Sequence, residues 1–221
     1  MGDSAPSQRT QIKRAAQRAI YDKNHMYTIL DEGLVAHVGL VQDGLPVVIP
    51  MGYARKGNDL LLHGSTSSRL MKAMKAGTDV CVTVTVLDGL VLARSPFHHS
   101  MNYRSVVAFG RPQVISDPQE KDAALEALVE HIIPGRSADG VRPNNKSELI
   151  STVIVSLSLD EASAKVRTGP PKDDKEDYEL DVWAGELPLQ QTVGKPVNDP
   201  KLKSGVSVPK YVAEYTRHST A

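Results

Sequence analysis

The sequence predicts a mainly β (α+β) protein in which six or seven strands form an antiparallel barrel with peripheral helices. Short runs rich in Val, Leu and Thr recur at close spacing between residues 34 and 114. Asp43-Gly44 and Gly57-Asn58-Asp59 separate neighbouring runs, as hairpin turns do. A Gly-rich turn between a first strand and a long helix is missing from the sequence, as is a Gly-Lys-Ser/Thr phosphate loop. A doubly wound sheet is therefore not expected.

The first third of the chain combines short helices with the first hairpin. Residues 1–10 are polar and predict a disordered N-terminus. Residues 11–32 space Ile and Ala as a helix does, and a second short helix over 25–32 should end at Gly33. Three strands separated by the two turns are expected next, over 34–41, 46–55 and 60–63.

The middle of the chain continues the strand pattern after another short helix. We expect that helix over 67–76 and a longer amphipathic helix over 119–132. Asp88-Gly89 should turn one strand back into the next. The expected strands are 80–87, 90–95, 103–114 (interrupted by Pro112) and 152–157.

The last quarter of the chain has weaker signals. Lys165 and Arg167 alternate along an extended segment, which suits either a cationic rim or an edge strand protected by charge. Residues 173–181 include six acidic side chains and should form a solvated loop. Pro-containing residues 190–221 predict an extended arm, so the predicted folded domain covers residues 11–189.

Bulk charge gives little reason to expect a polyanionic partner. The 221 residues have a net charge of zero and a pI near 7.1, which favours neither nucleic acid nor an anionic membrane. Residues 1–111 contain 13 Lys and Arg against 8 Asp and Glu (+5), whereas residues 112–221 contain 13 against 18 (−5). The positive half would favour an anionic ligand, although ordinary surface scatter explains the difference as well.

The single cysteine and the hydropathy pattern indicate a cytoplasmic protein. Cys81 has no second cysteine to pair with inside the chain, which is typical of a reducing compartment. The first ten residues lack the apolar segment of a signal peptide, and no apolar run approaches the ~20 residues of a membrane span.

The segment from His63 to Lys72 carries the strongest chemical signal. Small hydroxyl residues, among them Ser65 and Ser68, come just before a helix whose first turns carry Arg69 and Lys72. Backbone N–H groups, hydroxyl donors and two cations together suit a phosphate group. An ordinary helix cap with solvated charges would use the same residues.

The strand ahead of this segment contains Pro50 and Gly52 within an apolar run from Val47 to Tyr53. Proline cannot donate to a strand ladder and glycine offers no side chain, so this stretch is expected at a sheet edge or beside something flat. A planar ring lying along the strand would be within reach of its backbone groups.

Together with the block from Phe97 to Gly110, this order of strand, turn and Ser68-Arg69 heading a helix resembles a known family. It is similar to the flavin-binding split-barrel proteins of the pyridoxamine 5'-phosphate oxidase-like superfamily, above all its nitroimidazole-reductase-type and flavin-nucleotide-binding branch. The resemblance extends over residues 20–170. It implies a split barrel that forms a homodimer, with FMN in a groove between the two subunits.

Position by position, the resemblance also implies the residues that contact FMN. They are Val48, Ile49, Pro50 and Met51 along the isoalloxazine ring; His63 and Gly64 beside the ribityl-phosphate; Ser65, Ser68, Arg69 and Lys72 at the phosphate; and Asn102 and Ser105 as further polar contacts. The Trp and Arg that shape the substrate pocket of vitamin B6 oxidases have no secure counterpart, so vitamin B6 is not the expected substrate.

His98 and His99 are the predicted catalytic residues. In the flavin site, one of them would donate a proton or a hydrogen bond to a small-molecule substrate. Alternatively, one is simply exposed and the other is a satisfied polar residue at the barrel rim. Neighbouring residues of an extended chain point to opposite faces, so the two are not expected to share an ion and no metal site is predicted.

Three functions fit these features. The first is an FMN-dependent oxidoreductase acting on an unidentified small molecule. The second is a flavin carrier or sensor without turnover, because the sequence offers no unambiguous nucleophile. The third is a haem-binding or haem-degrading protein on the same barrel, with His98 or His99 as the axial ligand.

Overall fold

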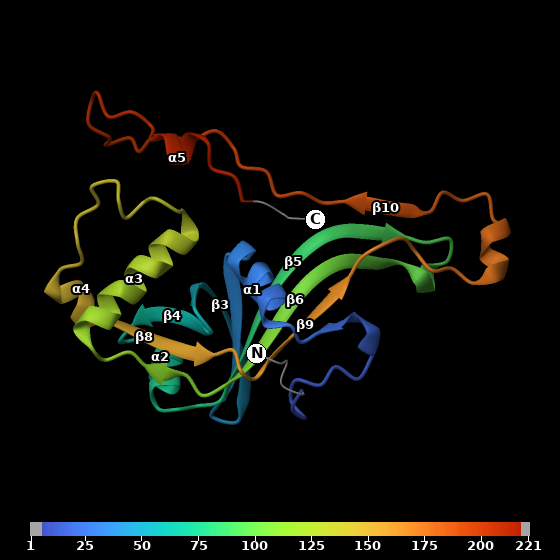
Figure 1. Ribbon diagram of the computed structural model, residues 1–221, viewed down its shortest axis with the longest axis horizontal. Helices are drawn as coiled ribbons and strands as arrows, with labels where there is room; N and C mark the ends of the chain where they lie inside the picture. The colour runs from blue at the N-terminus through green and yellow to red at the C-terminus, as the bar shows by residue number, and fades with distance from the viewer. Residues whose placement is uncertain (1–5, 218–221) are drawn as a thin grey trace.

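The computed structural model describes residues 6–217. Within this range ten strands form one antiparallel sheet in the order β1-β9-β6-β5-β2-β3-β4-β8-β7, with β10 paired to β5. Figure 1 shows the short strands β4 and β8 beside α2 and α3 at one end, while β5 and β6 extend as a long curved ribbon at the other. The mainly β, antiparallel prediction is confirmed.

The bounds of the elements follow the chain order. The strands are β1 (Ala19–Ile20), β2 (Val35–Gln42), β3 (Leu45–Lys56), β4 (Asp59–Ser65), β5 (Val80–Leu92), β6 (Ser100–Gly110), β7 (Gln113–Val114), β8 (Thr152–Ser158), β9 (Ala162–Arg167) and β10 (Gly185–Pro188). The helices are α1 (Lys23–Glu32), α2 (Arg69–Lys75), α3 (Pro118–Ile132), α4 (Lys146–Ser151) and α5 (Lys210–Ala213), with 3-10 turns η1 (Ala16–Arg18), η2 (Pro96–His98) and η3 (Lys175–Glu179).

The strand number is ten among the described residues, not six or seven. β1 and β7 have two residues each and β10 has four. Elements of this length are too short for an alternating pattern to emerge in the sequence. Their existence depends on tertiary pairing instead: β1 pairs with β9, β7 with β8, and β10 with β5.

The main core lies where α1 and α2 cover the barrel strands. Ile29, Leu62 and Val82, from α1, β4 and β5, are each at most 1% exposed. A second, smaller cluster joins the apolar face of α3, including Leu128, to β3, β4 and β8. The predicted packing role of the 119–132 helix is therefore correct.

The C-terminal end of α1 lies very close to the sheet. A Cβ atom built on Gly33 would lie 2.4 Å from Val84 Cγ1 and 2.7 Å from Tyr53 Oη. The Tyr53 hydroxyl itself donates to the Leu30 carbonyl at 2.5 Å. Only a residue without a side chain allows this approach, which accounts for the predicted helix end at Gly33.

Two predicted elements differ in the structure. Residues 11–22 contain only η1 and β1, because Ala15 has a left-handed φ of 53° that interrupts a helix. The predicted hairpin at Asp88-Gly89 is absent, since β5 continues through it to Leu92 with a β-bulge between Leu87 and Gly89. β6 and β10 flank this part of β5 on its two sides and keep it extended.

The expected break at Pro112 marks a change of partner. β6 ends at Gly110 after pairing with β9, and β7 begins at Gln113 and pairs with β8. A proline cannot donate to a ladder, so the chain leaves one side of the barrel there and joins the other.

The two ends of the described chain both return to the body of the molecule. Ser7 Oγ donates to Glu161 Oε2 at 2.5 Å, and Thr10 is 4% exposed. The predicted disorder of residues 1–5 concerns positions outside the described residues, so the domain boundaries stay predictions. The arm after β10 runs back along the molecule to α5 above α3 (Figure 1).

Among residues 6–217, every helix is too short or too polar to cross a lipid bilayer.

Candidate functional site

Two regions of the molecule are candidates for a functional site, and the first is the turn from β4 into α2. Ser65 Oγ lies 2.8 Å from Ser67 Oγ and accepts a hydrogen bond from the Ser67 N–H at 3.2 Å. The Ser68 hydroxyl caps α2 by accepting from the Met71 N–H at 3.4 Å. These contacts hold a row of hydroxyls at the exposed end of the strand.

Two cations stand beside these hydroxyls. Arg69 and Lys72 are exposed on α2, and within residues 6–217 neither has a hydrogen-bond or ion-pair partner. The structure thus brings together the four predicted residues Ser65, Ser68, Arg69 and Lys72 where β4 leads into α2. Neither positive charge is paired within residues 6–217. An anionic group would find both hydroxyl donors and charge there.

His63 and Gly64 lie just before this turn on β4. The side chain of His63 is half-buried, and its Nδ1 atom is buried without a partner among the described residues. Burial lowers the pKa of His63 below its usual 6.5, which favours the neutral imidazole. A Cβ on Gly64 would lie 2.8 Å from Met71 Cγ, so β4 and α2 approach closely here.

The predicted ring-facing strand is open along one edge. Val48 and Ile49 in β3 are 62% and 40% exposed. Residues 45–52 pair with β2 on one side, while β4 pairs only with residues 53–56 on the other. β3 and β4 therefore separate beyond Tyr53, and the outer edge of residues 45–52 has no strand partner among the described residues.

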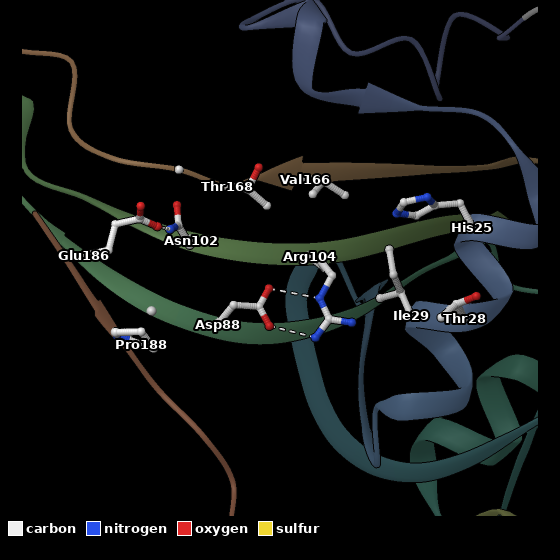
Figure 2. A pocket seen from close by; sticks show the side chains of 12 residues that line it. His25, Thr28, Ile29, Asp88, Asn102, Arg104, Val166, Thr168, Glu186 and Pro188 are labelled. Carbon is white, nitrogen blue, oxygen red and sulfur yellow. Dashed lines mark hydrogen bonds and ion pairs between the residues drawn. The ribbon is translucent and has the colours of Figure 1, made fainter. Parts of the chain in front are cut away.

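The second region is a cavity of about 500 Å³ below α1. Its walls come from the start of α1, the bulged part of β5, the facing part of β6, the end of β9 and β10. Figure 2 shows the His25 ring pointing along the cavity, with Asn102 and Glu186 at its far end. A cavity of this volume is typical of a small-molecule or cofactor site.

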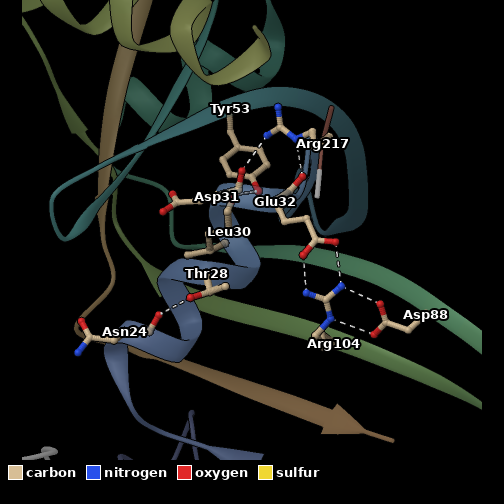
Figure 3. A network of polar contacts seen from close by, with 9 residues as sticks. All are labelled: Asn24, Thr28, Leu30, Asp31, Glu32, Tyr53, Asp88, Arg104 and Arg217. Atoms are coloured by element: carbon tan, nitrogen blue, oxygen red, sulfur yellow. Dashed lines mark hydrogen bonds and ion pairs between the residues drawn. The ribbon is translucent and has the colours of Figure 1, made fainter. Parts of the chain in front are cut away.

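A network of charges closes one side of this cavity. Arg104 donates to Glu32 at 2.5 and 2.8 Å and to Asp88 at 2.7 and 3.0 Å (Figure 3). The Arg104 and Glu32 side chains are each 10% exposed, so both bidentate pairs are largely shielded from water. The two carboxylates raise the pKa of Arg104 above its already high value.

A second polar network lies at the far end of the cavity. Arg167, which is 7% exposed, donates to the Asn102 side-chain oxygen and to the Gly169 carbonyl at 2.9 Å. The Asn102 amide in turn donates to Glu186 Oε2 at 2.5 Å, which ties β10 to β6 and β9. Asn102 is therefore committed to this chain of hydrogen bonds at the cavity wall.

Comparison with known proteins identifies the family of the chain. Residues 22–166, well over half of its length, match the model of the pyridoxamine 5'-phosphate oxidase family. The chain belongs to this family. No curated protein matches it significantly.

Two solved structures resemble the chain over most of its length, and a third shares the fold over about two thirds of it. The flavocytochrome Anf3 from Azotobacter vinelandii is 43% identical, covers 94% of this chain and 96% of its own, and has a TM-score of 0.89. The FAD and haem binding protein from Mycobacterium smegmatis is 38% identical, with coverages of 88% and 95% and a TM-score of 0.84. A putative 5-nitroimidazole antibiotic resistance protein from Bacteroides thetaiotaomicron, 22% identical over 67% of this chain and 86% of that one, shares the fold with a TM-score of 0.56.

Within this family fold, the predicted site residues fall into three places. The residues on β3 and β4 and those at the start of α2 lie along the split between the two strands. Asn102 belongs to the cavity, and Ser105 Oγ donates to the Lys165 carbonyl at 3.4 Å on the β6–β9 pair. His98 and His99 lie at the tip of the β5–β6 ribbon, outside the lining of the cavity.

The two histidines at the tip have local partners. His98 Nε2 lies 3.2 Å from Asp174 Oδ2, and His99 Nδ1 lies 2.9 Å from the Ser95 carbonyl. Their predicted catalytic role, which the resemblance would place across a subunit boundary, stays a prediction.

Sequence reasoning missed His25 as a lining residue of the cavity and the pairing of Arg104 with Glu32 and Asp88. Asp88 was assigned to a turn, and Glu32 to the end of a helix, so neither suggested a shielded ion pair. Arg104 lies on the same buried face of β6 as Val106 and Ala108, and a charge on such a face is the signal that could have indicated a buried polar network.

Proposed function

We propose that the protein is a flavin-dependent oxidoreductase. The phosphate of FMN or FAD would bind at Ser65, Ser68, Arg69 and Lys72, and the isoalloxazine ring would lie along the open edge of β3. The observation that carries this proposal is the uncommitted pair of cations on α2 at the split between β3 and β4. If the β3–β4 register is continued beyond Tyr53 and Leu62, Met51 falls opposite Gly64, beside this turn.

Flavin, once bound, would supply hydride or single-electron transfer, and the protein would bind and orient it. The hydroxyls at the β4–α2 turn would donate to the phosphate, and the Arg69 guanidinium would pair with it bidentately. The backbone of Pro50 and Met51 would border the ring. His63 Nδ1, buried and unpartnered within residues 6–217, is the nearest group on β4 able to exchange a proton or a hydrogen bond.

The exposed apolar surface of the β2–β3 hairpin supports a homodimer. Val35, Val41, Leu45 and Val48 are between 48% and 67% exposed in the single chain. Apolar side chains gathered on an open hairpin favour burial against a second copy. We therefore propose that the flavin lies between two subunits, with small-molecule substrate entering the same groove.

The cofactor itself can be identified on the purified protein. We expect absorbance in the flavin bands, and mass spectrometry of the released molecule distinguishes FMN from FAD. FAD is the flavin named for the 38% identical relative. A colourless protein that binds neither FMN nor FAD in titration would contradict the proposal.

Turnover distinguishes an oxidoreductase from a flavin carrier or sensor. For an oxidoreductase, anaerobic addition of NADH, NADPH or a chemical reductant bleaches the flavin bands, and a small-molecule acceptor such as a nitroaromatic compound restores them. A flavin that chemical reductant reduces but that no acceptor reoxidises would favour the carrier.

Haem binding is a second candidate function, favoured by the cavity below α1. Two relatives, 43% and 38% identical, are described as a flavocytochrome and as an FAD and haem binding protein. The cavity has about 500 Å³, with Ile29, Val166 and Pro188 among its apolar lining, and the His25 imidazole faces it (Figure 2). Its ring nitrogens have no partner among residues 6–217.

We propose His25 as the axial ligand if haem binds there, in place of His98 or His99. Addition of haemin to the protein should produce a Soret band that His25→Ala removes and that His98→Ala leaves intact. A band that is the same in both variants would place the haem elsewhere.

A further inference from the structure

We propose that His98, Asp174 and Asp177 form a binding site for a divalent transition-metal cation such as Zn²⁺ or Mn²⁺. One ligand atom from each of the three residues lies within 4.8 Å of the others. An imidazole nitrogen with two carboxylate oxygens is a donor set that these ions accept, with water completing the coordination. The site lies at the tip of the β5–β6 ribbon, apart from the cavity and from the β4–α2 turn.

A neighbouring arginine contacts the residues on either side of the two proposed aspartate ligands. The Arg94 backbone N–H and Nη1 each donate to the Asp173 carboxylate at 3.0 Å. The Arg94 guanidinium also lies over the Tyr178 ring, 4.9 Å from its centroid. Asp173 has a fully buried side chain, and Asp173 and Tyr178 bracket both proposed ligands in the sequence. These contacts tie the segment that carries both proposed ligands to Arg94 before any cation binds, which lowers the entropy cost of binding.

The negative charges of the Asp174 and Asp177 carboxylates also favour binding of a cation. Asp177 is half-buried, and within residues 6–217 its carboxylate has no hydrogen-bond or ion-pair partner. Asp174 has His98 Nε2 as its partner at 3.2 Å. Arg94 is already committed to Asp173. Two neighbouring carboxylates, one of them partly desolvated, are unfavourable without a counter-charge, and a divalent ion would neutralise both.

The His98 imidazole is oriented so that it could bind the same cation. His98 Nε2 points to the aspartates, whereas His99, the next residue, turns its Nδ1 to the Ser95 carbonyl at 2.9 Å. The two adjacent histidines thus serve different partners. The cation site takes His98 from η2, Asp174 from the residue that precedes η3 and Asp177 from η3 itself, so its ligands lie far apart in the sequence.

Calorimetric titration of the full-length protein with Zn²⁺ tests this inference. The protein is first treated with EDTA and dialysed, and its flavin content is measured so that loss of cofactor is recognised separately. We expect one strong Zn²⁺ site per chain, weakened at least about tenfold in Asp177→Asn and in His98→Gln. Asp181→Asn is the matched control, because Asp181 is an exposed carboxylate of the same acidic segment outside the cluster.

Circular dichroism of each variant checks that the fold is retained. Absence of Zn²⁺ binding in the wild-type protein would overturn the inference. So would wild-type affinity in both Asp177→Asn and His98→Gln, which would assign the ion to other residues. The result does not depend on the flavin site, because Zn²⁺ binding is measured directly.

Discussion

At the scale of single residues, the arginines of this protein occupy two kinds of environment. Some are exposed beside hydroxyl groups, and others are shielded from water and paired with carboxylates. Arg69 and Lys72 are exposed and free to meet a ligand, whereas Arg104 is shielded and already paired on both sides. The first arrangement suits binding, since little existing structure has to be broken. In the second arrangement each partner neutralises the other in a site with little water, so removal of one partner would leave an uncompensated charge.

Replacing Arg69 with alanine should weaken flavin binding and leave the fold intact. The lost charge-assisted hydrogen bonds to phosphate are worth about 1.5–3 kcal/mol, or roughly ten- to a hundredfold in Kd. Fluorescence titration of cofactor-free protein with FMN and FAD measures this change. Lys75→Ala is the control, since Lys75 is exposed at the other end of α2, and equal affinities of Arg69→Ala and wild type would remove Arg69 from the site.

Replacing Arg104 with methionine should destabilise the protein by about 3 kcal/mol. Methionine retains much of the side-chain volume but leaves the carboxylates of Glu32 and Asp88 without their shared cation. Urea unfolding of cofactor-free protein measures the free energy difference. Arg136→Met provides the comparison, because the Arg136–Asp139 pair is exposed and should contribute much less to stability. Equal effects of the two changes would show that shielding does not matter here.

At the scale of elements, the end of α1 is where three segments distant in sequence meet. Arg217 from the C-terminal arm donates to the carbonyls of Asp31, Glu32 and Gly33, at distances from 2.6 to 3.1 Å. From α3, His131 lies 4.8 Å from Tyr53 between ring centroids. The last carbonyls of a helix lack partners within it, so the arm satisfies groups that α1 leaves open. The same turn of α1 carries Glu32 to Arg104 (Figure 3).

The pH dependence of stability should include a contribution from His131. Its Nε2 lies 2.8 Å from the Gly33 carbonyl, and burial, the largest effect, lowers the pKa of His131 below 6.5. The unfolded imidazole therefore takes up a proton at a higher pH than the folded one. Stability from this group is complete above pH 6.5 and falls as the pH drops below it.

Unfolding free energies at pH 7.5 and pH 5.5 measure this contribution. The difference between the two pH values should be smaller in His131→Gln than in wild type, because glutamine does not titrate. An unchanged difference would mean that the folded and unfolded imidazoles bind protons equally.

Element prediction from the sequence succeeded where a local signal was strong. Asp43-Gly44 fixes the β2–β3 hairpin, and the cap residue Ser68 fixes the start of α2. It failed at Asp88-Gly89, because a Gly that can turn the chain can equally accommodate a bulge beside a close neighbour. A Cβ at Gly89 would lie 3.0 Å from the Leu187 carbonyl oxygen, so the glycine is needed for β10 to approach. That requirement comes from residues about a hundred positions away.

The candidate site also has one part that local sequence predicts and another part that it does not. The β4–α2 turn is a contiguous segment, so its hydroxyls and cations are visible in sequence. The cavity below α1 draws on α1, β5, β6, β9 and β10, and the Arg94–Asp173 anchor joins segments equally far apart. Sites that tertiary pairing assembles leave no spacing pattern in one sequence.

At the scale of the whole molecule, the sheet is split, and two of its surfaces expose apolar side chains in a single chain. The β2–β3 hairpin exposes apolar side chains on an open edge, and the β5–β6 ribbon extends far from the core with Leu87 and Met101 43% and 52% exposed (Figure 1). A ribbon that exposes apolar side chains is stabilised when a second layer covers it. Pairing of two copies would supply that layer and would enclose the open edge of β3, where the flavin ring is expected.

Native mass spectrometry of the purified protein tests this account most directly, because it weighs the assembly and its cofactors together. The account predicts a species of two chains that carries two flavin nucleotides, and partial release of flavin on introduction of Arg69→Ala. A single chain without bound flavin, both as purified and after incubation with FMN and FAD, would contradict it.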